Sequence, residues 1–246
     1  MILPEASRLY AAIDGTWPAA ATIQAGPWTL REGRGGGQRV SAATARGEWR
    51  EDDLSAAEKA MRMMKQAPLF MVRPEDRALD AVLAARGYEV KDPVTIWLCP
   101  VAQLTDKRIP PVTAFAIWEP LAIMREIWEA GGIGEARLRV MARAKGPKTG
   151  LFGRVSDRPA GAGFCAIHDR IALVHALEIA EPHRGKGLGK WMMRCAAHWA
   201  ADNGADWIGA LCTDANVGAN ALYRALRMRD AGGYHYRVLP EESDET

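Results

Sequence analysis

The segment from Ile171 to Gly204 constrains the fold more than any other part of this 246-residue chain. It begins with the apolar run I-A-L-V-H-A-L-E-I-A, which stops before Pro182, and continues with glycines at positions 185, 187 and 189. Apolar residues then recur at helical spacing, at Leu188, Met192, Cys195 and Trp199. This order predicts a strand, a tight glycine turn and a helix.

The predicted turn has the properties of an anion-binding site. Glycine lets the backbone come close to a ligand, and the first N–H groups of a helix have no partner within the helix. The helix dipole adds about half a positive charge at the same end, where Arg184, Lys186 and Lys190 also stand. An ordinary strand-to-helix turn is the alternative interpretation of the same residues.

Spacing excludes two common phosphate loops. A nucleoside-triphosphate loop requires Gly-x-x-x-x-Gly-Lys-Ser/Thr, whereas Gly189 and Lys190 are followed by Trp191 and the earlier glycine position is Arg184. A dinucleotide fingerprint requires Gly-x-Gly-x-x-Gly. Counting from Gly185 places Lys190 at the third glycine position, so this pattern fails as well.

A third pattern fits the turn. Arg184, Gly187 and Gly189 fill Arg/Gln-x-x-Gly-x-Gly/Ala, and the segment resembles the pyrophosphate loop of the GNAT superfamily of acyl-CoA-dependent N-acyltransferases. Because glycine-rich turns are common, this pattern needs support from elsewhere in the chain.

That support lies downstream, after a further predicted strand, A-D-W-I-G-A-L-C-T-D. The next predicted helix carries Asn216, Ala219 and Tyr223, which resembles the Asn-x-x-Ala-x-x-x-Tyr pattern common in GNAT proteins. The usual Gly-Phe/Tyr ending is replaced by Arg227-Met228, so the resemblance does not fix the path of the following strand.

The resemblance implies an activity. It implies an N-acetyltransferase that transfers an acetyl group from acetyl-CoA to a primary amine by direct attack in a ternary complex, without a metal. In this family the strand after the loop and the next helix splay the sheet, so that pantetheine lies in the gap. The implied cofactor-binding residues are Leu177, Ile179, Arg184, Gly185, Lys186, Gly187, Leu188, Gly189, Lys190, Asn216 and Tyr223.

Amine acylation needs a base for the amine and an acid for the departing thiolate, because amines are mostly protonated at neutral pH. By resemblance, Tyr223 is the acid, and a main-chain N–H near Ile179 polarises the thioester carbonyl. Glu178 is the candidate base, although it can equally face solvent or pair with an arginine, because both of its neighbours are apolar. His175 and His168 are lesser candidates.

The predicted helices and strands of the first half of the chain follow the same order as those of the second half: helix, paired strands, helix, strand, helix, strand. Its ending A-R-G-Y-E-V resembles the close of a GNAT domain. We therefore expect an α/β (α+β) fold with two GNAT-like domains, each a mixed, mostly antiparallel sheet flanked by helices. Residues 1–105 are the degenerate copy, because acids in Arg46–Asp53 stand where phosphates would bind, and residues 106–246 are the catalytic domain with its CoA loop at 184–189.

Charge, hydropathy and cysteine content narrow the classes of protein to which this chain can belong. A net charge of +2 and a pI near 8.4 do not indicate nucleic acid, because basic and acidic residues are interspersed. No basic leader precedes an apolar run and no apolar stretch is long enough for a membrane span. The cysteines form no metal or disulfide pattern, so we expect reduced thiols and a cytoplasmic protein: Cys99, Cys165, Cys195 and Cys212.

Several matters stay open at this stage. Basic residues of a predicted helix border the family's acceptor pocket, but they also suit a solvated helix face: Arg137, Arg139, Arg143 and Lys145. The acceptor, the acyl chain beyond acetyl and the oligomeric state are not indicated. A non-catalytic CoA-binding or interaction module is the alternative function.

Overall fold

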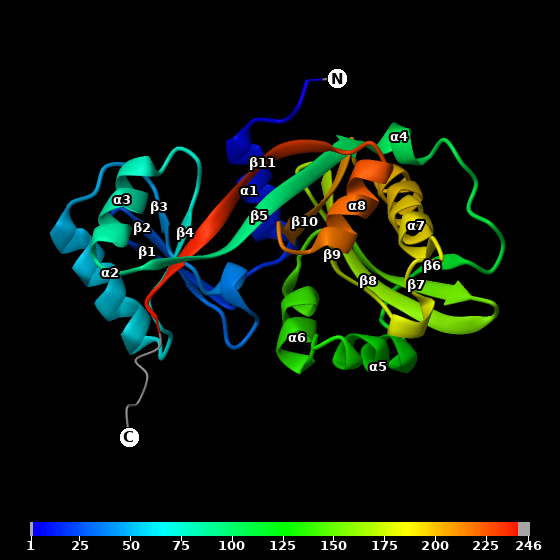
Figure 1. Ribbon diagram of the computed structural model, residues 1–246, viewed down its shortest axis with the longest axis horizontal. Helices are drawn as coiled ribbons and strands as arrows, with labels where there is room; N and C mark the ends of the chain where they lie inside the picture. Colours follow the sequence, from blue (N-terminus) through cyan, green and yellow to red (C-terminus); the bar gives the residue numbers. More distant parts are fainter. Residues whose placement is uncertain (1, 241–246) are drawn as a thin grey trace. The chain divides into compact units, whose positions relative to one another are not determined.

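The computed structural model describes residues 2–240, which form two compact units drawn from several segments of the chain (Figure 1). The larger unit comprises residues 2–18, 96–212 and 216–231, and the smaller unit comprises residues 19–95, 213–215 and 232–240. The strands β5 (Glu89–Pro100) and β11 (Arg229–Val238) contribute residues to both.

The larger unit is built on a mixed sheet with the strand order β11-β5-β10-β9-β8-β7-β6. Strands β6 to β9 pair in antiparallel fashion, whereas β9 and β10 are parallel. The strands not yet defined are β6 (Ala114–Ile117), β7 (Lys148–Val155), β8 (Arg158–His168), β9 (Ile171–Ile179) and β10 (Trp207–Thr213).

Helices cover both faces of this sheet. The long helix α7 packs on β6 to β9 from one face, and α1 and α5 pack on β8 and β9 from the other. Glycines allow the close approach, since a Cβ at Gly153 would lie 2.6 Å from Met192 Sδ of α7 and one at Gly150 would lie 2.8 Å from Met124 Cε of α5. The helices are α1 (Ala6–Thr16), α4 (Val101–Leu104), α5 (Ala122–Ala130), α6 (Glu135–Arg143), α7 (Leu188–Asp202) and α8 (Val217–Ala225).

The smaller unit has its own core around Phe70, whose ring contacts those of Trp28 and Tyr88 edge to face. A three-stranded sheet has the order β1-β2-β3, and within this unit β4 pairs antiparallel with β11, which neighbours β5. The elements are β1 (Ala21–Ala25), β2 (Trp28–Glu32), the 3₁₀ turn η1 (Gln38–Val40), β3 (Thr44–Ala45), α2 (Glu51–Met63), β4 (Leu69–Val72) and α3 (Arg77–Ala85).

The compact units do not coincide with the predicted boundary between residues 105 and 106. Helix α1 packs in the larger unit, where Trp17 lies against Phe164 with ring centroids 6.1 Å apart and Thr16 Oγ1 is 2.9 Å from His175 Nε2. Within residues 2–240, no helix has both the length and the apolar composition that crossing a membrane requires.

Candidate functional site

The loop between β9 and α7 has the predicted glycine-turn conformation. Gly185 and Gly187 have φ angles of 75° and 81°, in the left-handed region that side chains disfavour. A Cβ at either position would meet no atom within 4 Å, so both backbones border open space. Gly189 differs, because its Cβ would lie 3.1 Å from Leu222 Cδ2. It permits close packing of α7 on α8.

Strands β9 and β10 separate above this loop. Their parallel pairing covers Ile171–Val174 and Trp207–Ala210, although β9 continues to Ile179 and β10 to Thr213. A cavity of about 690 Å³ lies beside the loop, between the end of β9 and α8, within the size range of small-molecule sites. The sheet therefore opens at the end where the loop amides of α7 are exposed.

This cavity gathers most of the residues that the sequence singled out. Lys186 is exposed and does not line it. The predicted residues that do line it are Leu177, Glu178, Ile179, Arg184, Gly185, Gly187, Leu188, Gly189, Lys190, Asn216 and Tyr223.

Tyr223 is buried, with 4% of its surface exposed, at the wall of the cavity. Burial raises the pKa of its hydroxyl well above the ordinary value. Within residues 2–240 this hydroxyl forms no hydrogen bond. The buried hydroxyl is therefore favoured in its neutral form at the cavity wall.

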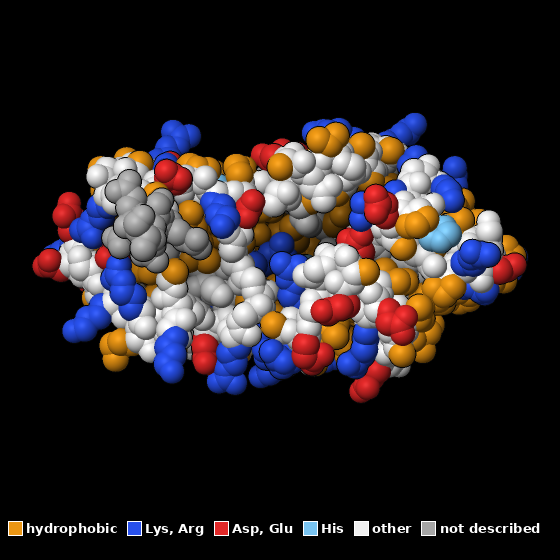
Figure 2. Space-filling view, turned by 60° about the horizontal axis from the view of Figure 1, so that its bottom comes forward, with side chains coloured by type: hydrophobic (Ala, Val, Ile, Leu, Met, Phe, Trp, Pro, Cys, Tyr) orange, Lys and Arg blue, Asp and Glu red, His pale blue; other side chains and the backbone are white. Residues whose placement is uncertain are grey.

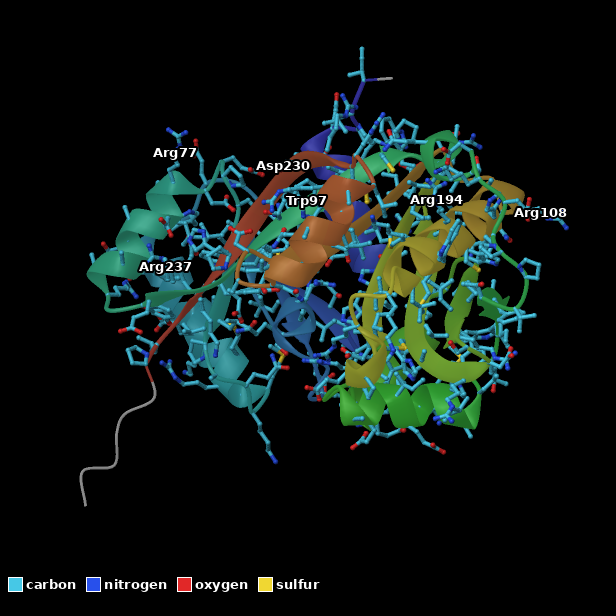
Figure 3. The ribbon with its side chains drawn as sticks, turned by 45° about the vertical axis from the view of Figure 1, so that its right-hand side comes forward. Arg77, Trp97, Arg108, Arg194, Asp230 and Arg237 are labelled. Atoms are coloured by element: carbon cyan, nitrogen blue, oxygen red, sulfur yellow. The ribbon has the colours of Figure 1, made fainter. Side chains whose placement is uncertain are left out.

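A buried hydrogen-bond network that sequence reasoning missed holds α8 in place. Asn220 Oδ1 accepts from Trp97 Nε1 at 2.9 Å and from Cys212 Sγ at 3.3 Å. Its amide nitrogen donates to Asn216 O at 2.9 Å. Because Trp97 lies on β5 (Figure 3) and Cys212 on β10, the network fixes the helix that carries Tyr223 to two strands.

Asn216 has a structural role that its predicted position explains. Its side-chain oxygen accepts from Ala219 N at 3.0 Å and caps the first turn of α8. The Asn-x-x-Ala spacing of the sequence is thus the spacing of a helix cap.

A bulge in β9 decides where Glu178 points. The pairing with β8 shifts register between Ala162 and Phe164, and opposite it Ala176 has a φ of 50°. The Ala176 carbonyl accepts from Trp128 Nε1 of α5 at 2.8 Å. Alternation along the strand is interrupted there, and Glu178 enters the cavity wall.

Glu178 is also the partner of an arginine, one of the alternatives considered for it. Arg184 Nη2 donates to Glu178 Oε1 at 2.9 Å, and Arg184 Nε donates to Ile179 O at 2.9 Å. The arginine therefore ties the loop back to β9. On its other side the carboxylate lies against the end of α5, since a Cβ at Gly131 would be 3.0 Å from Glu178 Oε2.

The two lesser histidine candidates lie away from this cavity. His175 is buried against Thr16 and the Trp17 ring, and His168 packs over Gly15, whose Cβ would be 2.4 Å from its ring. Both histidines therefore contribute to the packing of α1.

His183, which sequence reasoning did not single out, lines the cavity, and its Nδ1 is buried without a hydrogen-bond partner among the described residues. An orphaned buried polar atom is costly unless a ligand or water satisfies it. Among residues 2–240, no group of three histidine, cysteine or acidic side chains is placed to hold a metal ion.

Comparison with known proteins agrees with this geometry. Residues 118–227 match the sequence profile of the acetyltransferase (GNAT) family. An uncharacterized N-acetyltransferase, YobR, of Bacillus subtilis is 24% identical over 235 residues, which cover 91% of this chain and 94% of that protein.

Solved structures show a similar fold. A GCN5-related N-acetyltransferase from Kribbella flavida has a TM-score of 0.68 at 18% identity, covering 98% of this chain and 97% of its own. A tandem GNAT protein from the clavulanic acid biosynthesis pathway has a TM-score of 0.58 at 15% identity, covering 80% and 71%.

Proposed function

Because residues 118–227 match the acetyltransferase (GNAT) family, we propose that the protein is an N-acetyltransferase that uses acetyl-CoA. In the proposed reaction a primary amine attacks directly in a ternary complex. Acetyl-CoA supplies the thioester carbonyl as the electrophile.

The residues of the cavity fit CoA. Gly185 and Gly187 leave open space beside the start of α7, which suits a pyrophosphate at a helix N-terminus. The Lys190 ammonium and the orphaned His183 Nδ1 stand at the same cavity. The opening between β9 and β10 gives an extended pantetheine a path to Tyr223.

The chain's own groups divide the proton transfers. The Tyr223 hydroxyl, kept protonated by burial, holds the proton that a departing sulfur requires. Glu178 accepts the proton of the attacking amine, directly or through water. Arg184 fixes the Glu178 carboxylate at the cavity wall.

The observation that carries this proposal is the buried Tyr223 hydroxyl, which has no hydrogen-bond partner within residues 2–240, in the same cavity as the glycine loop. The test is a panel of amines screened for thiol release from subsaturating acetyl-CoA, with the Gly187→Val protein, whose CoA binding is weakened, for comparison. Acetylated product from at least one amine, and less of it with the Gly187→Val protein, is the expected result. CoA binding without acetyl transfer to any class of amine would contradict the proposal that the protein is an enzyme.

The structure does not favour an acidic acceptor bound by α6. Arg139 pairs with Glu135 at 3.9 Å, and the guanidinium of Arg143 donates to Pro18 O at 3.2 Å. Both cations therefore already have partners within the protein.

A non-catalytic CoA-binding module is the second candidate, and the ion pair between Glu178 and Arg184 favours it. A carboxylate that is held by an arginine can anchor the loop without accepting a proton. Transfer activity in the amine screen decides between the two candidates.

For the smaller unit we propose a degenerate GNAT-like copy that binds no CoA. The first turn of α2, which follows its strand β3, carries Glu51, Asp52 and Asp53. These acids occupy the helix end that would otherwise attract phosphate.

We further propose a cytoplasmic protein that binds neither membrane nor nucleic acid. The four cysteines are buried and form no disulfide within residues 2–240, as expected of reduced thiols. On the face shown in Figure 2, basic and acidic side chains are interspersed and form no single basic stripe.

A further inference from the structure

A second cavity lies within the smaller unit, apart from every residue of the proposed CoA site. Its volume is about 480 Å³, which is enough for a small organic molecule. One wall is the exposed side of α3, and the opposite wall belongs to β11 and to the part of β5 around Pro93.

Three arginines reach this cavity from different parts of the chain. Arg73 follows β4, Arg77 begins α3 and Arg237 lies on β11. The last two are labelled in Figure 3. Arginine presents a planar fork of N–H donors that matches the oxygens of a carboxylate or phosphate.

The protein itself neutralises part of this charge. Asp80 Oδ1 accepts from Arg237 Nε and lies beside His235 Nε2, each at 2.7 Å. The bond from Arg237, followed by that from His235, holds the pKa of Asp80 below its usual range. Arg237 also donates to Tyr88 O at 2.9 Å. The Asp80 carboxylate is therefore already paired with Arg237 and His235 within the protein.

A positive charge remains after this pairing. The second acid of the cavity, Asp214, accepts from Thr95 Oγ1 at 2.7 Å. Arg77 is exposed and forms no ion pair with any residue in the described range. The lining residues alone, three arginines and two aspartates, have a formal charge of +1 when His235 is neutral, and Asp76 lies beside Arg73, which leaves Arg77 as the cation on which the site depends.

The remaining wall is apolar. Ala81 and Ala84 stand one turn apart on α3, and Val72, Pro93 and Val94 face the same space. A ligand that satisfies both features has an anionic head for Arg77 and a small apolar body against the alanines.

We propose that this cavity, which we call the α3 cavity, binds a small organic anion, with a carboxylate or phosphate group at Arg77 and an apolar body along Ala81 and Ala84. The site lies outside the acyl-transfer site and does not depend on the proposed acetyltransferase activity. Its ligand is a second, non-reacting ligand of the smaller unit.

The test uses the full chain with three probes: benzoate, phenyl phosphate and the neutral benzyl alcohol. Amide chemical shifts are followed by nuclear magnetic resonance with saturating CoA present, so that the glycine loop is occupied. We expect saturable shifts at Arg77, Ala81 and Ala84 with benzoate, phenyl phosphate or both, and weaker binding of benzyl alcohol. Whichever anion binds more tightly identifies the head group.

Two variants with the same charge change complete the design. Arg77→Gln should raise the Kd of the anionic probe about tenfold, the loss of about one charge-assisted hydrogen bond, and should leave CoA affinity unchanged. Lys59→Gln removes an exposed cation of α2 in the same unit and should leave the Kd unchanged. The proposal is wrong if neither anion binds, if benzyl alcohol binds equally well, or if both variants act alike.

Discussion

Arg184 and Glu178 are joined across the β9–α7 loop by a hydrogen bond of 2.9 Å from Nη2 to Oε1. The bond allows two roles for Glu178, as a base for the amine or as an anchor for the loop. The two roles predict different kinetics.

Glu178→Gln should lower turnover about 10²-fold if the carboxylate is the base, because the amide cannot accept the proton. CoA affinity should change little, since the amide oxygen still accepts from Arg184. Turnover and CoA titration in the same preparation measure both quantities. Glu181→Gln, an exposed neighbour with the same charge change, is the control. Weakened CoA binding with turnover intact would assign Glu178 to the loop alone.

The contrast between loop and carboxylate also shows what the sequence could predict. The glycine loop and the Asn216 cap were predictable because each depends on residues within one or two turns of the chain. The orientation of Glu178 was not, because it depends on the bulge at Ala176, which the sequence around it does not signal. His183 was missed because its orphaned nitrogen is a property of burial.

Packing between distant segments of the chain explains the larger differences between the predictions from sequence and the structure. The sequence of the first 18 residues gives no sign that α1 packs on β8 and β9, so the predicted domain boundary differs from the compact units. Helix α2 begins at Glu51, where Asp53 Oδ2 accepts from Arg50 N at 2.9 Å, about one turn before the capping-box sequence Ser55-x-x-Glu58. Two capping signals compete there, and the earlier one prevails.

Gly187→Val should weaken CoA binding by more than threefold, about 0.7 kcal/mol. The side chain would strain a backbone at φ 81° and fill the open space beside the loop. Calorimetric titration measures the effect. Gly204→Val is a matched control, because Gly204 has a φ of 79° at the other end of α7 and also borders open space. It should cost stability and leave CoA affinity within threefold.

CoA should bind once per chain. The β9–α7 loop joins two left-handed glycines to the start of a fifteen-residue helix without a side-chain cap, whereas α2 begins with three acids. Calorimetry should give one site, and hydrogen exchange should show protection near Gly187 but none in Arg46–Asp53. Two sites, or protection of both segments, would show that the smaller unit also binds CoA.

Trp97→Phe should destabilise the protein by about 1–2 kcal/mol, because Asn220 Oδ1 loses its indole donor and the ring loses volume. Denaturant unfolding measures the change. Trp199→Phe is the control, since this half-buried indole makes no hydrogen bond within residues 2–240. If Trp97→Phe lowered the free energy of unfolding no more than Trp199→Phe does, the hydrogen-bond network would not stabilise α8.

The proton of Tyr223 gives the sharpest test of the chemistry. Tyr223→Phe keeps the ring but removes a donor used chiefly in the transition state, so turnover should fall about 10²-fold or more with little change in CoA affinity. The change in turnover needs an acceptor amine, which the screen supplies. A structural tyrosine would leave turnover nearly intact in the folded variant.

The pH dependence of the parent protein supplies an independent test of the same group. Burial raises the pKa of Tyr223 above the ordinary value of about 10, so the hydroxyl remains a donor throughout the neutral range, and turnover should show no loss from its ionisation below about pH 10. In the unfolded chain this tyrosine ionises near its ordinary pKa. Its contribution to stability is therefore fully present below about pH 10 and is lost as the pH rises further. The Tyr223→Phe protein should lose less stability than the parent above that pH in denaturant unfolding, and equal losses would show that the Tyr223 pKa is not raised.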